Sequence, residues 1–234
     1  MHRRALQAAL AELPAGCPPR LAFLHRAPGD PGAGGDTLLC LSASFNPITL
    51  AHLALVRAAA TLVPPGEVLL LLSLANVDKE MTGLSLERRA EILLAVAARR
   101  PAFSVALASH GRFVEKLAAI RACYPAAASP VFLLGADTLI RLFDPRYYTD
   151  RAAALERLFA GSRVIAATRA PHGPEALAAF LARPDVAPYA ARIAAVELPA
   201  HLARISATDV RARLARGDSV AHLVPPEALP LLGG

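Results

Sequence analysis

Residues 44–52 read Ser-Phe-Asn-Pro-Ile-Thr-Leu-Ala-His, and they stand between a short apolar run and a helix-like segment. The apolar run covers residues 37–41, and the helix-like segment extends from residue 50 to about residue 62. In α/β proteins, a strand followed by a tight polar turn and a helix start brings backbone N–H groups and the positive end of a helix dipole to a phosphate. Asn46 and Pro47 suit such a turn. The stretch is therefore a candidate nucleotide-handling site.

Two side chains of this stretch can act together. Thr49 and His52 lie three positions apart, so in the first turn of a helix both point the same way. A histidine there can donate a hydrogen bond to a phosphate oxygen whose charge changes during a reaction. Alternatively, His52 is an ordinary polar residue of a first helical turn, and the sequence around it has to distinguish the two interpretations.

The rest of the chain alternates short apolar runs with longer segments rich in Ala, Leu and Arg. The runs predict strands at residues 37–41, 67–74, 103–106, 130–134, 163–167 and 192–198. The longer segments predict helices at residues 50–62, 85–99, 112–122, 136–142, 151–159, 174–182 and 206–216. Such alternation is typical of a parallel sheet with helices on both faces and right-handed crossovers. Ligands of such sheets bind beyond the carboxyl ends of the strands.

The N-terminal part is expected to be set apart from the rest. Residues 27–35 are rich in Pro and Gly and read as a flexible connector. Residues 1–26 then form an N-terminal helical extension. The predicted organisation is an extension with its connector, residues 1–35, followed by a single domain, residues 36–234.

Composition narrows the class of protein. Of the 234 residues 55% are hydrophobic, yet no uninterrupted apolar span has the length of a membrane helix, and the densest run, residues 68–72, is strand-length. The basic start is interrupted by Glu12 and Pro14 before a signal-like apolar core develops. Three scattered cysteines, without metal-ligand spacing, indicate reduced thiols. We expect a cytoplasmic protein without a membrane segment.

The charge of the chain points to anionic ligands. A formal net charge of +6 suits nucleotides as well as nucleic acids. The chain has no Trp and little aromatic content for stacking bases, and its arginines are spread along the sequence. A nucleic-acid partner is therefore the weaker interpretation. Homo-oligomer formation is compatible with the sequence.

Three motifs in order carry a family resemblance. Residues 44–52 resemble the T/HxGH signature of the nucleotidylyltransferase superfamily, in the form found in nicotinamide and nicotinate mononucleotide adenylyltransferases. Residues 205–211, Ile-Ser-Ala-Thr-Asp-Val-Arg, are similar to its Ile-Ser-Ser-Thr-x-Ile-Arg box, and residues 217–225 continue the likeness. Residues 135–138, Gly-Ala-Asp-Thr, follow an apolar run as the family's Gly-x-Asp does. The resemblance implies a Rossmann-like, doubly wound α/β nucleotidylyltransferase domain.

The resemblance also implies an activity, the transfer of AMP from ATP to nicotinamide or nicotinate mononucleotide with release of pyrophosphate. Phosphate is already a nucleophile, so such a site mainly needs positioning and positive charge. Mg²⁺ is expected to arrive with ATP, whose phosphates hold it, and no protein metal ligands are expected. ATP and a mononucleotide are the implied partners.

The resemblance implies site residues within the matched motifs, and further ones from their places after a strand or at a helix start. The residues implied to be catalytic are His52, Thr49 and Arg211. Those implied to bind ATP are Ser44, Phe45, Asn46, Ser206, Thr208 and Lys79. Those implied to contact the acceptor nucleotide are Asp137, Arg88 and Arg169. Asp137 would accept hydrogen bonds from ribose hydroxyls, and Arg211 would supply a forked donor to the leaving phosphates.

Several of these residues have plainer interpretations. Ser206 with Asp209 forms a good helix cap, and Asp137 can cap the helix that begins at residue 136. Lys79 is equally an exposed loop lysine, and Arg88 and its neighbour Arg89 can simply decorate a helix surface, which is the interpretation that we favour for Arg89. The aromatic residues near position 147 are buried turn residues or rings that stack on a base.

Departures from the family pattern leave alternatives open. Ala43 stands where relatives usually carry Gly, Ala207 replaces a serine, and the chain lacks the tryptophan that many relatives place against the acceptor base. A different phosphate acceptor, CTP as donor, or a non-catalytic nucleotide-binding regulator of the same fold are the alternatives. The retained Thr49, His52 and Arg211 argue for an enzyme.

Overall fold

The computed structural model describes residues 2–28, 37–74, 83–124, 129–169 and 171–233. Within them, a 7-stranded sheet has the order β1-β4-β3-β2-β5-β6-β7. The strands are β1 (Leu21–His25), β2 (Thr37–Ala43), β3 (Pro65–Ser73), β4 (Phe103–Ala108), β5 (Ser129–Gly135), β6 (Arg163–Thr168) and β7 (Ile193–Glu197). Neighbouring strands are parallel except for β1, which pairs antiparallel with β4.

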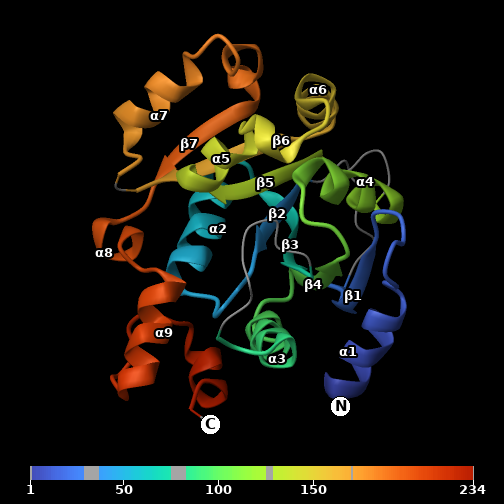
Figure 1. The fold of residues 1–234 in the computed structure, drawn as a ribbon. Helices are drawn as coiled ribbons and strands as arrows, with labels where there is room; N and C mark the ends of the chain where they lie inside the picture. The colour runs from blue at the N-terminus through green and yellow to red at the C-terminus, as the bar shows by residue number, and fades with distance from the viewer. Residues whose placement is uncertain (1, 29–36, 75–82, 125–128, 170, 234) are drawn as a thin grey trace.

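Helices cover both faces of the sheet (Figure 1). The α-helices are α1 (His2–Ala11), α2 (Leu50–Leu62), α3 (Leu86–Ala97), α4 (Phe113–Cys123), α5 (Ala136–Leu142), α6 (Arg151–Gly161), α7 (Pro174–Leu181), α8 (Ala200–Ala203) and α9 (Ala207–Arg216). Short 3-10 helices are η1 (Pro145–Tyr147), η2 (Ala187–Arg192) and η3 (Pro226–Leu231). Among the described residues, none of the helices combines the length and apolar character needed to cross a bilayer.

The central strand β2 is buried on both sides, as expected for a parallel strand between two helical layers. Its residues alternate between two cores. Leu39 and Leu41 pack with α2, α3 and α9 in one core, whereas Leu38 and Cys40 pack with α4, α5 and α6 in the other. The residues that follow at the carboxyl end of β2 therefore lie between the two helical layers.

The strand order creates a crevice at the same point. From β2 the chain runs outward through β3 and β4, and then returns to build β5, β6 and β7 on the other side. In open α/β sheets, ligands bind where the strand order reverses, beyond the carboxyl ends of the strands. In this sheet the strand order reverses between β2 and β5, so the expected ligand position lies beyond the carboxyl ends of these two strands.

The predicted α/β fold is confirmed, with element ends shifted by a few residues. One expectation was wrong: the N-terminal extension is not helical throughout, because Leu21–His25 form the edge strand β1. A run of five residues carries little periodicity, and its partner β4 lies some 80 residues further along the chain, where local sequence patterns do not reach. Most of the predicted connector, residues 29–36, lies outside the described residues.

Candidate functional site

A cavity of about 450 Å³ opens at the carboxyl ends of β2, β5 and β6. Its walls come from the turn after β2, the first turn of α2, the starts of α4, α5 and α9, and the end of β6. A concave site of this size at a switch in strand order is the usual place for a small ligand.

Most of the sequence-predicted site residues meet in this cavity. Those that line it are Ser44, Asn46, Thr49, His52, Asp137, Arg169, Ser206, Thr208 and Arg211. Thus four distant parts of the chain converge, and three of them carry the motifs whose places after strands predicted this. Lys79 lies outside the described residues.

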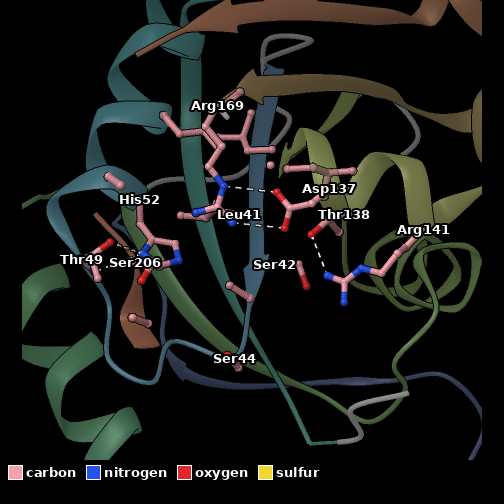
Figure 2. A pocket seen from close by; sticks show the side chains of 18 of the residues that line it. Leu41, Ser42, Ser44, Thr49, His52, Asp137, Thr138, Arg141, Arg169 and Ser206 are labelled. Carbon is pink, nitrogen blue, oxygen red and sulfur yellow. Dashed lines mark hydrogen bonds and ion pairs between the residues drawn. The ribbon is translucent and has the colours of Figure 1, made fainter. Parts of the chain in front are cut away.

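Thr49 and His52 form a reciprocal cap at the start of α2 (Figure 2). The backbone N–H of Thr49 donates to His52 Nδ1 at 3.0 Å, and Thr49 Oγ1 lies 2.8 Å from the same nitrogen. The imidazole thus takes the place that a glutamate side chain has in a capping box. Thr49 is only 1% exposed, so its direct effect in this structure is to orient the histidine ring.

This hydrogen bond assigns the protonation of His52. A backbone N–H can only donate, so Nδ1 accepts and the neutral ring carries its proton on Nε2. Burial, and secondarily the charge of Arg169, lower the pKa of His52 to about 4. At neutral pH the ring is therefore an uncharged N–H donor beside the cavity.

Arg211 ties the turn after β2 to the start of α9. Its Nη1 donates to the Asn46 carbonyl at 2.7 Å, and its Nη2 donates to Thr208 Oγ1 at 3.3 Å. Asn46 Oδ1 in turn accepts from the Leu84 backbone at 2.9 Å. Gly83 makes this packing feasible, since a Cβ there would lie 2.6 Å from Arg211 Cδ. The guanidinium thus reaches the cavity from a braced position.

A second arginine supports the same turn. Arg89 on α3 is 5% exposed, and its Nη1 donates to the Ser44 carbonyl at 3.0 Å. Burial lowers the pKa of this guanidinium, which nevertheless stays charged at neutral pH. The sequence favoured a surface position for Arg89, which was wrong, because the helix turns this residue under the motif.

Ser206 caps α9, as predicted. Its Oγ accepts from the Asp209 backbone N–H at 3.1 Å. The Asp209 carboxylate is 2.9 Å from Arg213 Nε, one helical turn on, instead of completing a capping box. Figure 2 shows Ser206, at the start of α9, next to Thr49 and His52 in the first turn of α2.

Asp137, at the start of α5, and Arg169, at the end of β6, face each other in another wall of the cavity (Figure 2). Arg169 Nε and Nη2 lie 3.3 and 3.2 Å from the two carboxylate oxygens, in a forked ion pair. Burial raises the pKa of Asp137, but the hydrogen bonds and charge of Arg169 outweigh it and hold the pKa below its ordinary value. Both residues lie at the cavity as predicted, already paired with one another.

Two predicted residues do not line the cavity. Phe45 is 1% exposed, and its ring packs against the His52 ring with 5.5 Å between centroids. The turn directs Phe45 into the core, and from there its ring packs against the side of the His52 ring that faces the core. Arg88 points away on α3 and is ion-paired with Glu91 at 3.1 Å.

The most informative residue that the sequence analysis missed is Lys116. It lies on α4, lines the cavity and is 5% exposed. The sequence did contain a signal for this residue, because helical periodicity places Lys116 on the apolar stripe between Phe113 and Ile120. A charged residue on a buried stripe is unusual and indicates either a partner or a ligand.

Comparison with known proteins agrees with this geometry. Residues 41–213 match the family described as cytidylyltransferase-like. The matched segment begins in β2 and ends in α9, so it contains every described motif that lines the cavity.

Individual relatives carry related names. A provisionally named nicotinamide mononucleotide adenylyltransferase of Schizosaccharomyces pombe is 33% identical over 138 residues, which are 57% of this chain and 53% of that protein. This chain thus matches about half the length of that relative.

Solved structures share the fold. A nicotinic acid mononucleotide adenylyltransferase of Plasmodium falciparum, in complex with NaAD, superposes with a TM-score of 0.61 at 14% identity, over 84% of this chain and 94% of that one. A second structure of the Plasmodium enzyme, in complex with APC, gives a TM-score of 0.59 at 13% identity over the same shares of the chains.

Proposed function

Because the chain belongs to the cytidylyltransferase-like family of nucleotidylyltransferases, we propose that it transfers AMP from ATP to nicotinamide or nicotinate mononucleotide. The products are a dinucleotide and pyrophosphate. The observation that carries the proposal is the convergence of His52, Arg211 and the Asp137–Arg169 pair on one cavity. The names of the Schizosaccharomyces and Plasmodium relatives support the choice of acceptor.

The reaction is a displacement at phosphorus. A phosphate oxygen of the mononucleotide attacks the α-phosphorus of ATP, the new P–O bond forms, and the bond to the α–β bridging oxygen breaks. The electron pair leaves with pyrophosphate. The protein's part is to align the two phosphates and to stabilise the charge that grows on the leaving group.

In this proposal the first turns of α2 and α9 bind the triphosphate. His52 donates its Nε2 proton in a hydrogen bond to a phosphate oxygen, and the neutral ring keeps this proton throughout. Arg211 and Thr208 bind the β- and γ-phosphates from α9. The positive end of the α2 dipole adds to the attraction.

Mg²⁺ enters this scheme as part of the substrate MgATP. Within the described residues, no group of three or more His, Cys, Asp or Glu side chains is arranged to hold a metal. Mg²⁺ is commonly held by phosphate oxygens and water with few protein ligands, so a site that binds triphosphate needs no cage of its own.

The acceptor nucleotide would occupy the wall formed by α4, α5 and the end of β6. Asp137 and Arg169 each have further hydrogen-bonding capacity, for a ribose hydroxyl and a phosphate oxygen respectively. Their ion pair keeps both side chains extended towards the cavity in the free protein.

Mass spectrometry of reaction products tests this function. The purified protein is incubated with MgATP and, one at a time, nicotinamide mononucleotide, nicotinate mononucleotide, phosphopantetheine and several sugar phosphates, with pyrophosphate followed in parallel. We expect a dinucleotide and stoichiometric pyrophosphate from a pyridine mononucleotide, and no turnover when CTP replaces ATP.

Two results would contradict the proposal. Product from a sugar phosphate or phosphopantetheine alone would reassign the acceptor. ATP binding without pyrophosphate release from any acceptor would indicate a nucleotide-binding regulator. A preparation of His52→Ala, processed identically, excludes a contaminating enzyme as the source of product.

A further inference from the structure

The ammonium group of Lys116 has neither a hydrogen-bonding nor an ionic partner in the part of the chain that the structure describes, and only an aromatic ring lies close to it. Its Nζ lies 4.7 Å from the centroid of the Phe113 ring, and no hydrogen bond or ion pair joins it to a described residue. The neighbouring carboxylate of Glu115 is bound instead to Arg112, at 2.6 Å. Lys116 is thus a cation enclosed by protein and directed to the cavity.

Such an arrangement is unfavourable in the free protein. Removing an ammonium from water without a counter-charge disfavours the charged form. Burial accordingly lowers the pKa of Lys116 to about 8, although Glu115 opposes the shift. Most molecules still carry the charge at pH 7, so an anion that enters the cavity would meet a cation that water shields poorly.

The position of Lys116 indicates which part of a ligand it meets. The phosphate-binding side chains His52 and Arg211 project from α2 and α9, which pack on one face of the sheet. Helix α4 packs on the other face, with α5 and α6. In the arrangement proposed above, the acceptor phosphate meets Arg169 and its ribose meets Asp137, so its base occupies the rest of that wall, which α4 forms.

The walls on that side suit a flat aromatic ring. Phe113, Leu142, Tyr147 and Tyr148 line the cavity together with Lys116. The Tyr148 hydroxyl donates to the Leu142 carbonyl at 2.7 Å, which fixes this wall. Apolar and aromatic side chains with one buried cation are the recognition chemistry of an aromatic ring that carries an acid group.

A second unpartnered polar group lies on the same side. Ser42 Oγ is buried, lines the cavity and has no hydrogen-bond partner among the described residues. Ser42 follows Leu38 and Cys40 in the alternation of β2, so it belongs to the face that α4 covers. A hydroxyl and an ammonium together can satisfy both oxygens of a carboxylate.

Resting on the proposed function, we propose that Lys116, assisted by Ser42, binds the ring carboxylate of nicotinate mononucleotide and makes the acid the preferred acceptor over the amide. The amide offers the ammonium only a neutral carbonyl oxygen. A hydrogen bond between charged groups is stronger than one to a neutral acceptor, by an amount that corresponds to a preference of about 10- to 100-fold.

Steady-state kinetics with the two acceptors tests the assignment. In the wild type, kcat/KM for nicotinate mononucleotide is expected to exceed that for nicotinamide mononucleotide about 10- to 100-fold. Lys116→Met keeps an unbranched side chain as far as the ε carbon and removes the charged nitrogen, so kcat/KM for the acid should fall to that for the amide, while kcat/KM for the amide changes less than about 3-fold. Ser42→Ala should lower kcat/KM for nicotinate mononucleotide by about 3- to 10-fold and leave kcat/KM for the amide unchanged.

A matched control removes a positive charge elsewhere. Arg157 is exposed on α6 and does not line the cavity. Arg157→Met should leave kcat/KM for both acceptors at the wild-type values. This control distinguishes the effect of the local Lys116 contact from the effect of losing one positive charge. Equal use of acid and amide by the wild type would overturn the assignment, and so would an equal loss for both acceptors in Lys116→Met.

Binding measurements separate this inference from the proposed function. Calorimetric titration of each mononucleotide into the wild type and Lys116→Met, without ATP, needs no turnover. Tighter binding of the acid that disappears in the variant supports the assignment even if no dinucleotide forms. Equal affinities in the wild type, or no binding of either mononucleotide, overturn it even if AMP transfer to another acceptor is observed.

Discussion

The two ends of the cavity differ in how their polar groups are held. At the α2–α9 end, protein groups already bind one another: Thr49 orients His52, and Arg211 holds the carbonyl of Asn46. At the α4 end, Lys116 and the hydroxyl of Ser42 are buried, and neither has a hydrogen-bonding partner among the described residues. The first arrangement is rigid before a ligand arrives, whereas the second is completed by one.

This difference is what a transferase needs. Phosphate displacement depends on donors that are aligned before reaction, because reorganising them would add to the barrier. Recognition of the acceptor depends on a free-energy difference between similar molecules, and an unsatisfied buried group penalises whichever ligand fails to satisfy it. Substitutions at the α2–α9 end should therefore lower the rate of catalysis. Substitutions at the α4 end should change the preference between acceptors and can stabilise the folded protein.

The largest effect is expected for His52→Ala. Removing a preorganised donor to the reacting phosphates should lower kcat by about 10²- to 10³-fold. Circular dichroism and the thermal midpoint should show an intact fold, because α2 keeps its apolar contacts. Pyrophosphate release in the steady state is the measurement. His201→Ala, an exposed histidine on α8 outside the cavity, is the control, and activity of His52→Ala within about 3-fold of wild type would remove His52 from the mechanism.

A smaller loss, about 10- to 100-fold in kcat/KM for ATP, is expected for Arg211→Lys. One ammonium cannot hold the Asn46 carbonyl and Thr208 together and still reach a phosphate, so the turn loses its brace. Arg213→Lys, on the same helix but paired with Asp209, should behave as wild type. If both variants retain activity, α9 has no phosphate-binding role.

Gly83→Ala tests how Arg211 is braced against the turn after β2 without replacing a charged residue. The added Cβ would lie 2.6 Å from Arg211 Cδ and 2.8 Å from Asn46 Oδ1, on a backbone with φ of +106°. We expect about a 10-fold loss of kcat/KM and a destabilisation of about 1–3 kcal/mol. Gly16→Ala has a similar φ of +75° with no atom within 4 Å, so it should lose stability alone. Activity losses of equal size in both variants would show that backbone strain, not the brace, is responsible.

At the α4 end, a substitution is expected to stabilise the folded protein, whereas Gly83→Ala at the other end is expected to destabilise it. Lys116→Met removes a buried charge that no described residue neutralises, so the free energy of unfolding at pH 7 should increase by about 1–3 kcal/mol. The pKa of Lys116 is about 8 in the folded protein and ordinarily 10.5, so between these values the unfolded chain binds more protons. Wild-type stability from this group therefore rises with pH across that window.

Urea unfolding at several pH values measures this reversal. The stability difference between Lys116→Met and wild type should be largest at or below pH 7 and should shrink as the pH approaches 10.5. A variant that is less stable than wild type at pH 7 would mean that Lys116 has a stabilising partner, and the contrast between the two ends of the cavity would not hold.

Much of the fold was readable from local patterns. Helix α2 was predicted with its observed ends, because an apolar period and a polar turn define it within the same few residues. Strand β1 was not predicted, because its hydrogen bonds are made with β4, far along the chain. Secondary structure that depends on a distant partner leaves only a weak trace in its own sequence.

The candidate site divides in the same way. Motif order and strand ends predicted that His52, Asp137 and Arg211 would converge. The helix pattern indicated a buried face around Lys116 but not the cavity that this face borders. Arg89 was assigned to the surface, because one helix seen alone does not reveal which turn packs over it.

The sequence by itself determined the alternation of strands and helices, the motifs that line the cavity and the capping of α9, since each depends on residues within a turn or two of one another. Tertiary structure decided which charges are satisfied. Arg89 and Arg211 meet backbone carbonyls of a distant turn, and Asp137 meets Arg169. Among the described residues, Lys116 meets an aromatic ring but no hydrogen-bonding or ionic partner. Whether a buried charge is paired depends on what packing brings beside it, and only the folded chain specifies those neighbours.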